Sequence, residues 1–257
     1  MRRTDIETIQ VSMWGDQLAR RIASGHVDAE FVVRVLEPFA SERRIRRMKE
    51  VFASRIDAVT VVMDSICDPH NGAALLRTCE ALGVARVHLV EQGASFLAHA
   101  RVARGTHKWV EVRSHSSALS CARALHDDGM VLVAAHPQGD LVPEDLSKLP
   151  RVALVLGNEH HGIGAELTSA CDHAVRVPMR GFAESLNVSV SGAILLAGAV
   201  SGRPGDLAEW EQRRLYARGL AVSVPNADAL IENAAGQLSD GSQASLDGLP
   251  FPKTPAQ

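Results

Sequence analysis

The stretch Gly181-Phe182-Ala183-Glu184-Ser185-Leu186-Asn187-Val188-Ser189 is the most informative part of this chain. It is too polar for the start of an ordinary buried helix and too apolar for a surface loop. Two stretches precede it, Gly157-Asn158-Glu159-His160-His161-Gly162 and Asn71-Gly72-Ala73-Ala74-Leu75-Leu76-Arg77-Thr78-Cys79. Each alone is a weak signal, because glycine-rich turns between strands and helices occur in many α/β proteins. Their order and spacing along one chain make the signal specific.

Apolar strand-like runs alternate with helical patterns around these stretches. We expect strands at 58–63, 84–90, 108–112, 130–135, 152–156 and 174–177, and helices at 71–82, 116–127, 164–171 and 185–200. Strands that hold few polar residues and are each followed by a helix are typical of a parallel sheet. The pattern therefore predicts an α/β fold, with a mostly parallel sheet covered by helices on both faces.

The two ends of the chain differ from this pattern. Apolar residues within 1–40 recur at helical spacing until Pro38, which predicts a helical N-terminal extension. Residues 219–257 are rich in small and acidic residues and hold few large apolar ones, so we expect a tail that is flexible in its final part. The predicted division is 1–40, 41–218 and 219–257.

Composition limits the partners and the compartment. The chain has 257 residues, is 46% hydrophobic and carries a net charge of −3, which is ordinary for a soluble globular protein. Any RNA binding must therefore use a local basic patch. The four cysteines form no CxxC pair, which favours reduced thiols and a cytoplasmic location. No signal peptide core and no apolar run of about 18 residues is present, so neither secretion nor a membrane span is expected.

The strongest local charge lies at residues 42–55, with six basic and two acidic residues. One interpretation is a solvated helix face, with Ile45, Met48, Val51 and Phe52 packed inward. A second, compatible one is that the same helix contacts phosphates, because arginine supplies bidentate donors.

The chain lacks the common nucleotide-binding motifs. It has no G-x-G-x-x-G after its first strand and no G-x-x-x-x-G-K-[ST], which disfavours a nicotinamide dinucleotide and a P-loop nucleotide. Parallel sheets bind ligands beyond the carboxyl ends of their strands, where the loops 157–164 and 177–186 are expected. The class of ligand that remains possible is an adenosine with a charged tail, held by loop backbone and apolar side chains. No metal site is predicted from His70, His107, His160 and His161, because adjacent histidines point apart and no third ligand has suitable spacing.

The three stretches, with Gly105-Thr106-His107-Lys108-Trp109, resemble the motifs of the SPOUT methyltransferases, most closely the TrmH-type tRNA ribose 2′-O-methyltransferases. The similarity covers about residues 42–218. It implies transfer of a methyl group from S-adenosyl-L-methionine (SAM) to a ribose 2′-hydroxyl in RNA. It also implies a deep C-terminal trefoil knot and a homodimer. Guanosine-18 of the tRNA D-loop is the suggested target, and ribosomal RNA is the chief alternative.

The resemblance also implies a SAM pocket. Gly157, Val177, Met179 and Leu186 would hold adenine and ribose through backbone groups, with Ala135 lining the same pocket. A glycine lets the main chain approach a ligand closely. From the residue types alone, core packing is the preferred interpretation of the three large apolar side chains.

Arg77 matches the catalytic arginine of the family, whose proposed partner is a phosphate beside the target ribose. From the helical pattern alone, it is either a surface arginine or one that points into a cleft. A guanidinium stays protonated, so we expect a clamp on phosphate and 2′-oxygen rather than a base. Water, phosphate or Glu159 then accepts the proton.

Further polar residues are expected to position the substrate. Asn71, Ser185 and Asn187 are candidates, because in-line methyl transfer depends mainly on positioning. Helix capping is the alternative for Asn71 and Ser185, which stand at predicted helix starts. The candidates for RNA binding are the basic residues Arg43, Arg44, Arg46, Arg47 and Lys108.

Two other classes of protein remain open from the sequence. One is a non-catalytic RNA-binding relative, although Arg77, Glu159 and Asn187 are all present. The other is a small-molecule α/β enzyme, for which no competing catalytic constellation is found. Asn158, the His160-His161 pair and the acidic tail depart from the family pattern and leave the RNA substrate open.

Overall fold

The computed structural model describes residues 9–10, 17–23, 25–90 and 109–239. Contacts divide the chain into two compact units. The first, an α/β unit, consists of Met1–Met13 with Ser54–Leu207, and the second, a helical unit, of Trp14–Ala53 with Ala208–Gln257. None of the described helices is long and apolar enough to cross a membrane.

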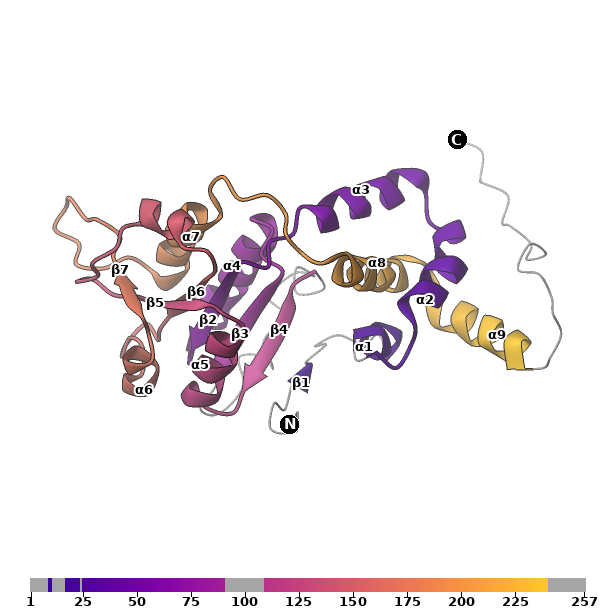
Figure 1. The fold of residues 1–257 in the computed structure, drawn as a ribbon, viewed down its shortest axis with the longest axis horizontal. Coiled ribbons are helices and arrows are strands. Elements are labelled where there is room, and N and C mark those ends of the chain that lie inside the picture. Colours follow the sequence, from indigo (N-terminus) through magenta and orange to yellow (C-terminus); the bar gives the residue numbers. More distant parts are fainter. Residues whose placement is uncertain (1–8, 11–16, 24, 91–108, 240–257) are drawn as a thin grey trace. The chain divides into compact units, whose positions relative to one another are not determined.

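A sheet forms the centre of the α/β unit (Figure 1). Its strands are β1 (Ile9–Gln10), β2 (Val59–Asp64), β3 (Arg86–Val90), β4 (Glu111–His115), β5 (Val131–Ala135), β6 (Val152–Leu156) and β7 (His173–Val175). Among the described residues they lie in the order β1-β4-β3-β2-β6-β5-β7. Only β1 pairs antiparallel in this order, so the prediction of a mostly parallel sheet is confirmed.

Helices cover both faces of this sheet, as predicted. The helical elements of the unit are α4 (Pro69–Ala81), α5 (Ala118–Asp127), the 3-10 segment η4 (Pro143–Lys148), α6 (Ala165–Ser169) and α7 (Val188–Val200). Buried side chains of α4, α7 and η4 pack on one face, and those of α5 and α6 on the other. A Cβ atom at Gly192 would collide with Leu75, so this glycine lets α7 lie close against α4.

The helical unit combines segments from both ends of the chain. It contains α1 (Gln17–Ala23), α2 (Ala29–Leu36), the 3-10 turn η1 (Glu37–Phe39), α3 (Glu42–Ala53), α8 (Glu209–Ser223) and α9 (Ala227–Ser239). The helix predicted over the basic segment is present, with Met48 and Phe52 buried. The division into units cuts the chain after residues 53 and 207, so α3 and α8 group with the terminal helices rather than with the sheet.

Three local expectations are corrected by the structure. The strand expected at 108–112 is β4, displaced toward the polar residues Arg113 and His115. The last helix begins at Val188 rather than at residue 185. The region expected as a tail from residue 219 contains the end of α8 and all of α9, because Ala227, Ile231 and Ala234 form a buried helical stripe. Residues 240–257 lie outside the described residues.

Candidate active site

A pocket of about 920 Å³ lies beyond the carboxyl ends of β5, β6 and β7. This is the edge at which parallel α/β sheets bind ligands. Its volume falls within the range of about 300–1,000 Å³ usual for small-molecule sites. All five residues predicted to hold SAM line it: Ala135, Gly157, Val177, Met179 and Leu186. The structure thus brings together side chains that are up to 51 residues apart in the sequence.

The apolar wall of the pocket is not ordinary core. Met179 is 39% exposed, and Val177 and Leu186 are half-buried. Ala135 and Val177 also pack against the core on the α4 side of the sheet. Exposed apolar groups around a cavity suit the flat faces of an adenine ring.

Gly157 is small for a reason that the sequence did not reveal. A Cβ atom there would collide with the backbone of Gly162 and Ile163. The loop folds back on itself, with Asn158 and Gly162 exchanging two backbone hydrogen bonds of 2.9 Å. The glycine therefore makes room for its own loop, and this closure shapes the pocket wall.

A chain of hydrogen bonds beside the pocket joins the three sequence stretches. The Nδ2 atom of Asn71 donates to Glu159 Oε1 at 2.7 Å. The Nδ2 atom of Asn187 donates to Asn71 Oδ1 at 3.0 Å. Glu159 and Asn187 line the pocket, so Asn71 fixes two pocket residues at once.

Glu159 is saturated with donors. Its carboxylate also accepts from the backbone N–H groups of Cys67, at 3.0 Å, and Asp68, at 3.4 Å. Burial raises the pKa of Glu159, but the hydrogen bonds from Asn71 and the backbone lower it more, and the resulting pKa lies below its ordinary value. A carboxylate held in its ionised form by donors is a poor proton acceptor.

The helix caps fall on other residues than expected. Asp68 caps α4 through His70 N at 2.8 Å, and Asn187 caps α7 through Ser189 N at 2.8 Å. The capping interpretation of Asn71 and Ser185 is therefore wrong, because each helix starts two or three residues away from them. Ser185 is exposed, lines the pocket and makes no hydrogen bond within the described residues.

Arg77 lies apart from this network. Its side chain is exposed, does not line the pocket, and makes no hydrogen bond or ion pair to any described residue. Six residues separate it from Asn71, which corresponds to about 9 Å along the helix and a rotation of about 240°. The structure therefore leaves Arg77 on a different side of α4 from the one that meets Glu159.

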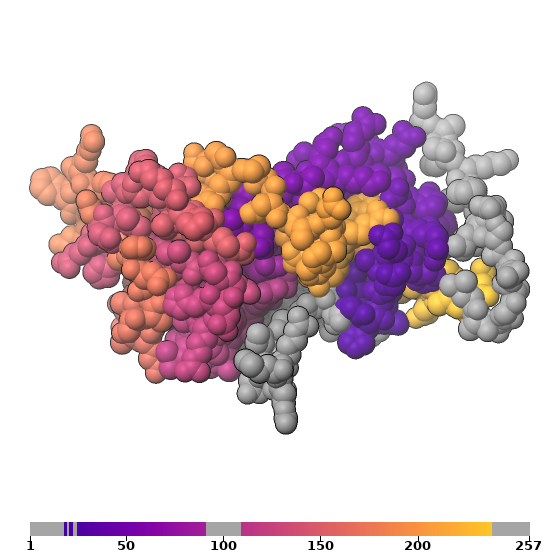
Figure 2. Space-filling model, viewed as in Figure 1, coloured from indigo at the N-terminus to yellow at the C-terminus, as the bar shows by residue number. Residues whose placement is uncertain are grey.

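The candidates for RNA binding lie mostly on α3. Arg43, Arg44, Arg46 and Arg47 are exposed there, and the indigo part of the surface in Figure 2 includes this region of the chain. Lys108 lies outside the described residues. Arg55, counted with the basic segment, is only 1% exposed and pairs with Glu80 at 3.0 Å, so it is not a phosphate contact.

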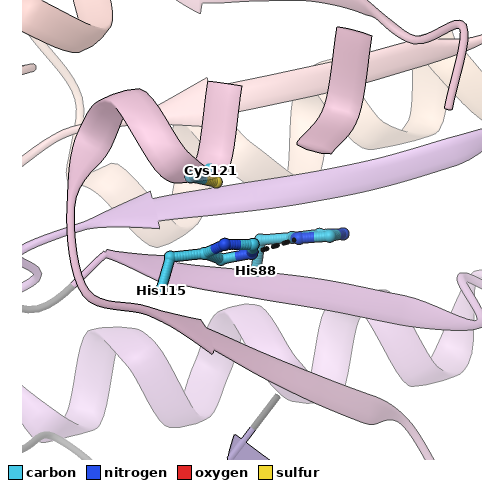
Figure 3. A group of neighbouring side chains, drawn as sticks. All are labelled: His88, His115 and Cys121. Carbon is cyan, nitrogen blue, oxygen red and sulfur yellow. Dashed lines mark hydrogen bonds between the residues drawn. The ribbon is translucent and has the colours of Figure 1, made fainter. Parts of the chain in front are cut away.

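One cluster went unnoticed in the sequence. His88 on β3, His115 on β4 and Cys121 on α5 converge in the interior of the α/β unit (Figure 3). The four histidines considered from the sequence did not include this pair. A signal could have been found only by pairing the two strands in register, because the histidines are 27 residues apart.

Comparisons with known proteins define the class. A family model described as the SpoU rRNA Methylase family matches residues 58–197, so the chain belongs to this family. It is 33% identical over 157 residues to the tRNA (guanosine(18)-2′-O)-methyltransferase of Thermus thermophilus, covering 61% of this chain and 81% of that one. With the enzyme of the same description from Escherichia coli (strain K12) it shares 32% identity over 186 residues, covering 68% and 81%.

Solved structures agree. The TrmH/SpoU tRNA modifying enzyme of A. aeolicus aligns with a TM-score of 0.61 and 26% identity, over 71% of this chain and 98% of that one. The SpoU methyltransferase AviRb of Streptomyces viridochromogenes, solved with AdoMet, aligns with a TM-score of 0.51 and 26% identity, over 57% and 60%. The chain is an RNA ribose 2′-O-methyltransferase that uses SAM as its methyl donor.

Proposed function

We propose that this enzyme methylates the ribose 2′-hydroxyl of guanosine-18 in tRNA. The observation that carries the proposal is that two of the three sequence stretches line one pocket and the third joins them beside it, through the hydrogen bonds of Asn71 with Glu159 and Asn187. Relatives from several bacteria that share this region are described as enzymes of that activity. A relative from Xanthomonas axonopodis, 33% identical over 170 residues, is described as a 23S rRNA (guanosine-2′-O-)-methyltransferase.

The test is a methyl-transfer assay with the purified chain, labelled SAM and either unmodified tRNA or ribosomal RNA fragments. We expect label in tRNA, and its loss when guanosine-18 is replaced by another nucleotide. Label confined to ribosomal RNA would replace the tRNA proposal by the ribosomal one. No label in either RNA would overturn both.

SAM fits the pocket described above. The wall offers half-exposed apolar side chains and backbone groups from two loops, which suit an adenosine. We propose that Gly157, Val177, Met179 and Leu186 hold it, with Ala135 beneath. We expect Leu186→Asp to weaken SAM binding, measured by calorimetric titration. The fold should be retained, because Leu186 is only half-buried.

When bound, SAM supplies a methyl group on a positively charged sulfur. The 2′-oxygen forms a bond to the methyl carbon as the carbon–sulfur bond breaks, and the hydroxyl proton leaves. The positive charge disappears in this step, so the protein mainly has to align the nucleophile. Asn71, Asn187 and Ser185 are proposed as positioning residues, and Arg77 as the clamp on the neighbouring phosphate and the 2′-oxygen.

Glu159 is proposed as a positioning residue rather than the base. Three donors and a lowered pKa oppose its protonation. The proton then passes to water or phosphate. We expect Glu159→Gln to lower turnover at every pH and to leave the shape of the pH–rate profile unchanged. If the fall in rate at low pH disappears in Glu159→Gln, Glu159 is the base.

A homodimer would bring Arg77 to a pocket. Val190 and Ile194 are 47% and 37% exposed, one turn apart on α7, and Phe182 in the preceding loop is fully exposed. Helix α7 packs on α4, whose exposed residues include Arg77. We propose that a second copy covers this apolar surface, so that Arg77 of one copy serves the pocket of the other.

Subunit mixing tests this arrangement. Arg77→Ala and Glu159→Gln chains, each impaired alone, are unfolded together and refolded at equal amounts. Random pairing in a two-fold dimer gives about half mixed dimers, each with one intact site, and restores about a quarter of wild-type activity. No restoration would mean that Arg77 acts within its own chain, and a monomer in light scattering would exclude the dimer.

We also propose the remaining features of the family. One is the deep C-terminal trefoil knot. The helical unit is proposed to hold RNA through Arg43, Arg44, Arg46 and Arg47, and Lys108 is kept as a candidate. We propose a cytoplasmic location, where tRNA is processed.

A further inference from the structure

The interior of the α/β unit contains a group of three metal-ligating side chains away from the pocket. One nitrogen of His88, one nitrogen of His115 and the sulfur of Cys121 all lie within 4.8 Å of one another. His88 is 2%, His115 9% and Cys121 0% exposed. Figure 3 shows the two imidazoles side by side on adjacent strands, with Cys121 on the helix that covers them.

The register of the sheet explains why these residues meet. In the parallel pair of β3 and β4, Val90 lies opposite His115, and His88 lies two residues before Val90. Side chains two apart on a strand share a face, so both histidines point toward α5. There they meet a core of Val62, Val90 and Leu125 that also contains Cys121.

We propose that His88, His115 and Cys121 bind one borderline-soft cation of the Zn²⁺ type, which ties β3, β4 and α5 together. Imidazole and thiolate are the ligands that Zn²⁺ prefers, whereas Mg²⁺ and Ca²⁺ prefer oxygen. The site supplies three protein ligands and leaves the fourth position to water. It is independent of the proposed RNA substrate.

Both imidazoles have to turn before they can bind one ion, because their nearest nitrogens point at each other. The Nδ1 atom of His88 and the Nε2 atom of His115 are 2.8 Å apart and share a hydrogen bond. Two nitrogens on one tetrahedral Zn²⁺ lie about 3.3 Å apart, given bonds of about 2.0–2.1 Å. The imidazole that donates this hydrogen bond must also move its proton to its other nitrogen, a change of tautomer that releases no proton.

Metal binding at this site is coupled to loss of a proton. Neutral imidazole binds a metal through a lone pair without losing a proton, whereas a cysteine binds as the thiolate. Binding of one cation therefore forms one metal–sulfur bond and releases one proton, from the Cys121 thiol.

The surrounding charges are compensated. Two arginines, Arg113 and Arg86, face the histidines, but both pair with Glu111, at 3.0 and 3.6 Å, and Arg86 also pairs with Asp57. The Asp64 carboxylate is buried near Cys121. One thiolate and this carboxylate together balance the charge of a divalent cation.

The test uses the full chain, purified under reducing conditions and stripped with a chelator. Addition of Co²⁺, which replaces Zn²⁺ as a coloured probe, is expected to give a thiolate-to-cobalt absorption band that saturates at one ion per chain. Competition with a chromophoric chelator then measures Zn²⁺ affinity, and Zn²⁺ is expected to raise the thermal midpoint.

Cys121→Ser should abolish the band and weaken Zn²⁺ binding more than about 100-fold, because loss of an outer-shell partner alone costs about 10- to 100-fold. Cys79→Ser is the matched control, since Cys79 is equally buried, and it should keep the band. Retention of the band in Cys121→Ser, or its loss in Cys79→Ser, would overturn the proposal.

X-ray absorption of the wild-type chain loaded with one Zn²⁺ covers the case in which Cys121→Ser does not fold. The expected first shell holds one sulfur at about 2.3 Å and two imidazole nitrogens at about 2.0–2.1 Å. A shell without sulfur, or no stoichiometric binding, would leave the pair as two hydrogen-bonded histidines. Neither SAM nor RNA is present, so the result does not depend on the proposed substrate.

Discussion

The two ends of α4 have different surroundings: side chains near its start are held by hydrogen bonds, and the arginine further along is exposed. Near its start, Asn71 is 8% exposed and bonds to both Glu159 and Asn187. Six residues later, Arg77 is exposed and has no partner among the described residues. Asn71 is fixed in place by the fold, and Arg77 is free to contact RNA or a second copy of the chain.

This difference separates two kinds of contribution to the reaction. A residue held by two hydrogen bonds stabilises the site before any substrate arrives. A free guanidinium contributes nothing to the fold and becomes useful when a phosphate or a reacting oxygen reaches it. Substitutions at the two ends should therefore separate stability from turnover.

The largest effect is expected at the free end. Arg77→Ala should lower turnover by about 10³-fold, as does loss of a donor from a reacting oxygen, while the thermal midpoint stays unchanged. Single-turnover kinetics and thermal melting measure the two quantities. His70→Ala, exposed on the same helix, is the control and should keep full turnover. Wild-type turnover in Arg77→Ala would remove the contrast between the ends.

The fixed end should show a mixed effect. Asn71→Ala leaves Asn187 Nδ2 without its acceptor and leaves Glu159 Oε1 with only the long hydrogen bond from Asp68 N, at 3.4 Å. We expect a loss of about 1–3 kcal/mol in the free energy of unfolding. Turnover should fall about 10²-fold, because small displacements of positioning groups cost about that much.

Denaturant unfolding and saturating kinetics measure both changes in Asn71→Ala. Thr78→Ala is the control on the same helix, since the Thr78 hydroxyl donates within α4, to Ala74 O at 3.0 Å. A loss of turnover without any loss of stability in Asn71→Ala would mean that Asn71 resembles Arg77 instead.

Two of the exposed arginines on α3 sharpen the comparison, because they too are free, whereas Arg44 donates to Ser223 O and Arg47 pairs with Glu50. Arg43 and Arg46 have no partner among the described residues and lie on the side of α3 away from the buried Met48. If each contacts one phosphate, the double Arg43→Ala/Arg46→Ala variant should reduce the slope of log affinity against log salt by about 1.4–1.8. Turnover at saturating RNA should be unchanged. Lys49→Ala, whose lysine already pairs with Glu37 at 3.4 Å, is the control.

Much of the α/β unit could be predicted because its strands are unbroken apolar runs. Residues 152–156 were predicted as a strand and form β6 with the same limits. The residues of the pocket wall were named from the family motifs, and all five line the pocket. The helical unit was harder, since α9 buries alanines and one isoleucine that do not stand out from a tail.

The polar network could not be predicted from local patterns. Asn71 is 88 residues from Glu159 and 116 from Asn187, and no periodicity reports contacts at such separations. The burial of Arg55 could not be predicted for a related reason, because an arginine in a basic segment is expected to be exposed. Only the packing shows that Glu80 lies within 3.0 Å to receive it.

The smallest expected effect concerns the acid titration of Glu159. Its pKa in the folded chain lies below the ordinary value of 4.5. Well above pH 4.5 the carboxylate is ionised in both states and its hydrogen bonds stabilise the fold. As the pH falls, the unfolded chain takes up its proton first, so this stability is lost as the pH passes through the folded pKa. Carboxyl NMR of labelled Glu159 measures the shift directly.

The two ends of α4 should differ in this titration as well. Asn71→Ala removes a side-chain hydrogen bond that lowers the pKa of Glu159, so the pKa should rise and the acid-dependent loss of stability should shrink. Within one chain Arg77 is not among the groups that shift this pKa, so Arg77→Ala should leave the titration of Glu159 in the same chain unchanged. In the proposed dimer the pocket meets the guanidinium of the other copy, so the measurement is made in mixed dimers with Glu159 labelled only in the Arg77→Ala chain. A shift in that chain, whose partner is wild type, would contradict the proposed contribution across the dimer.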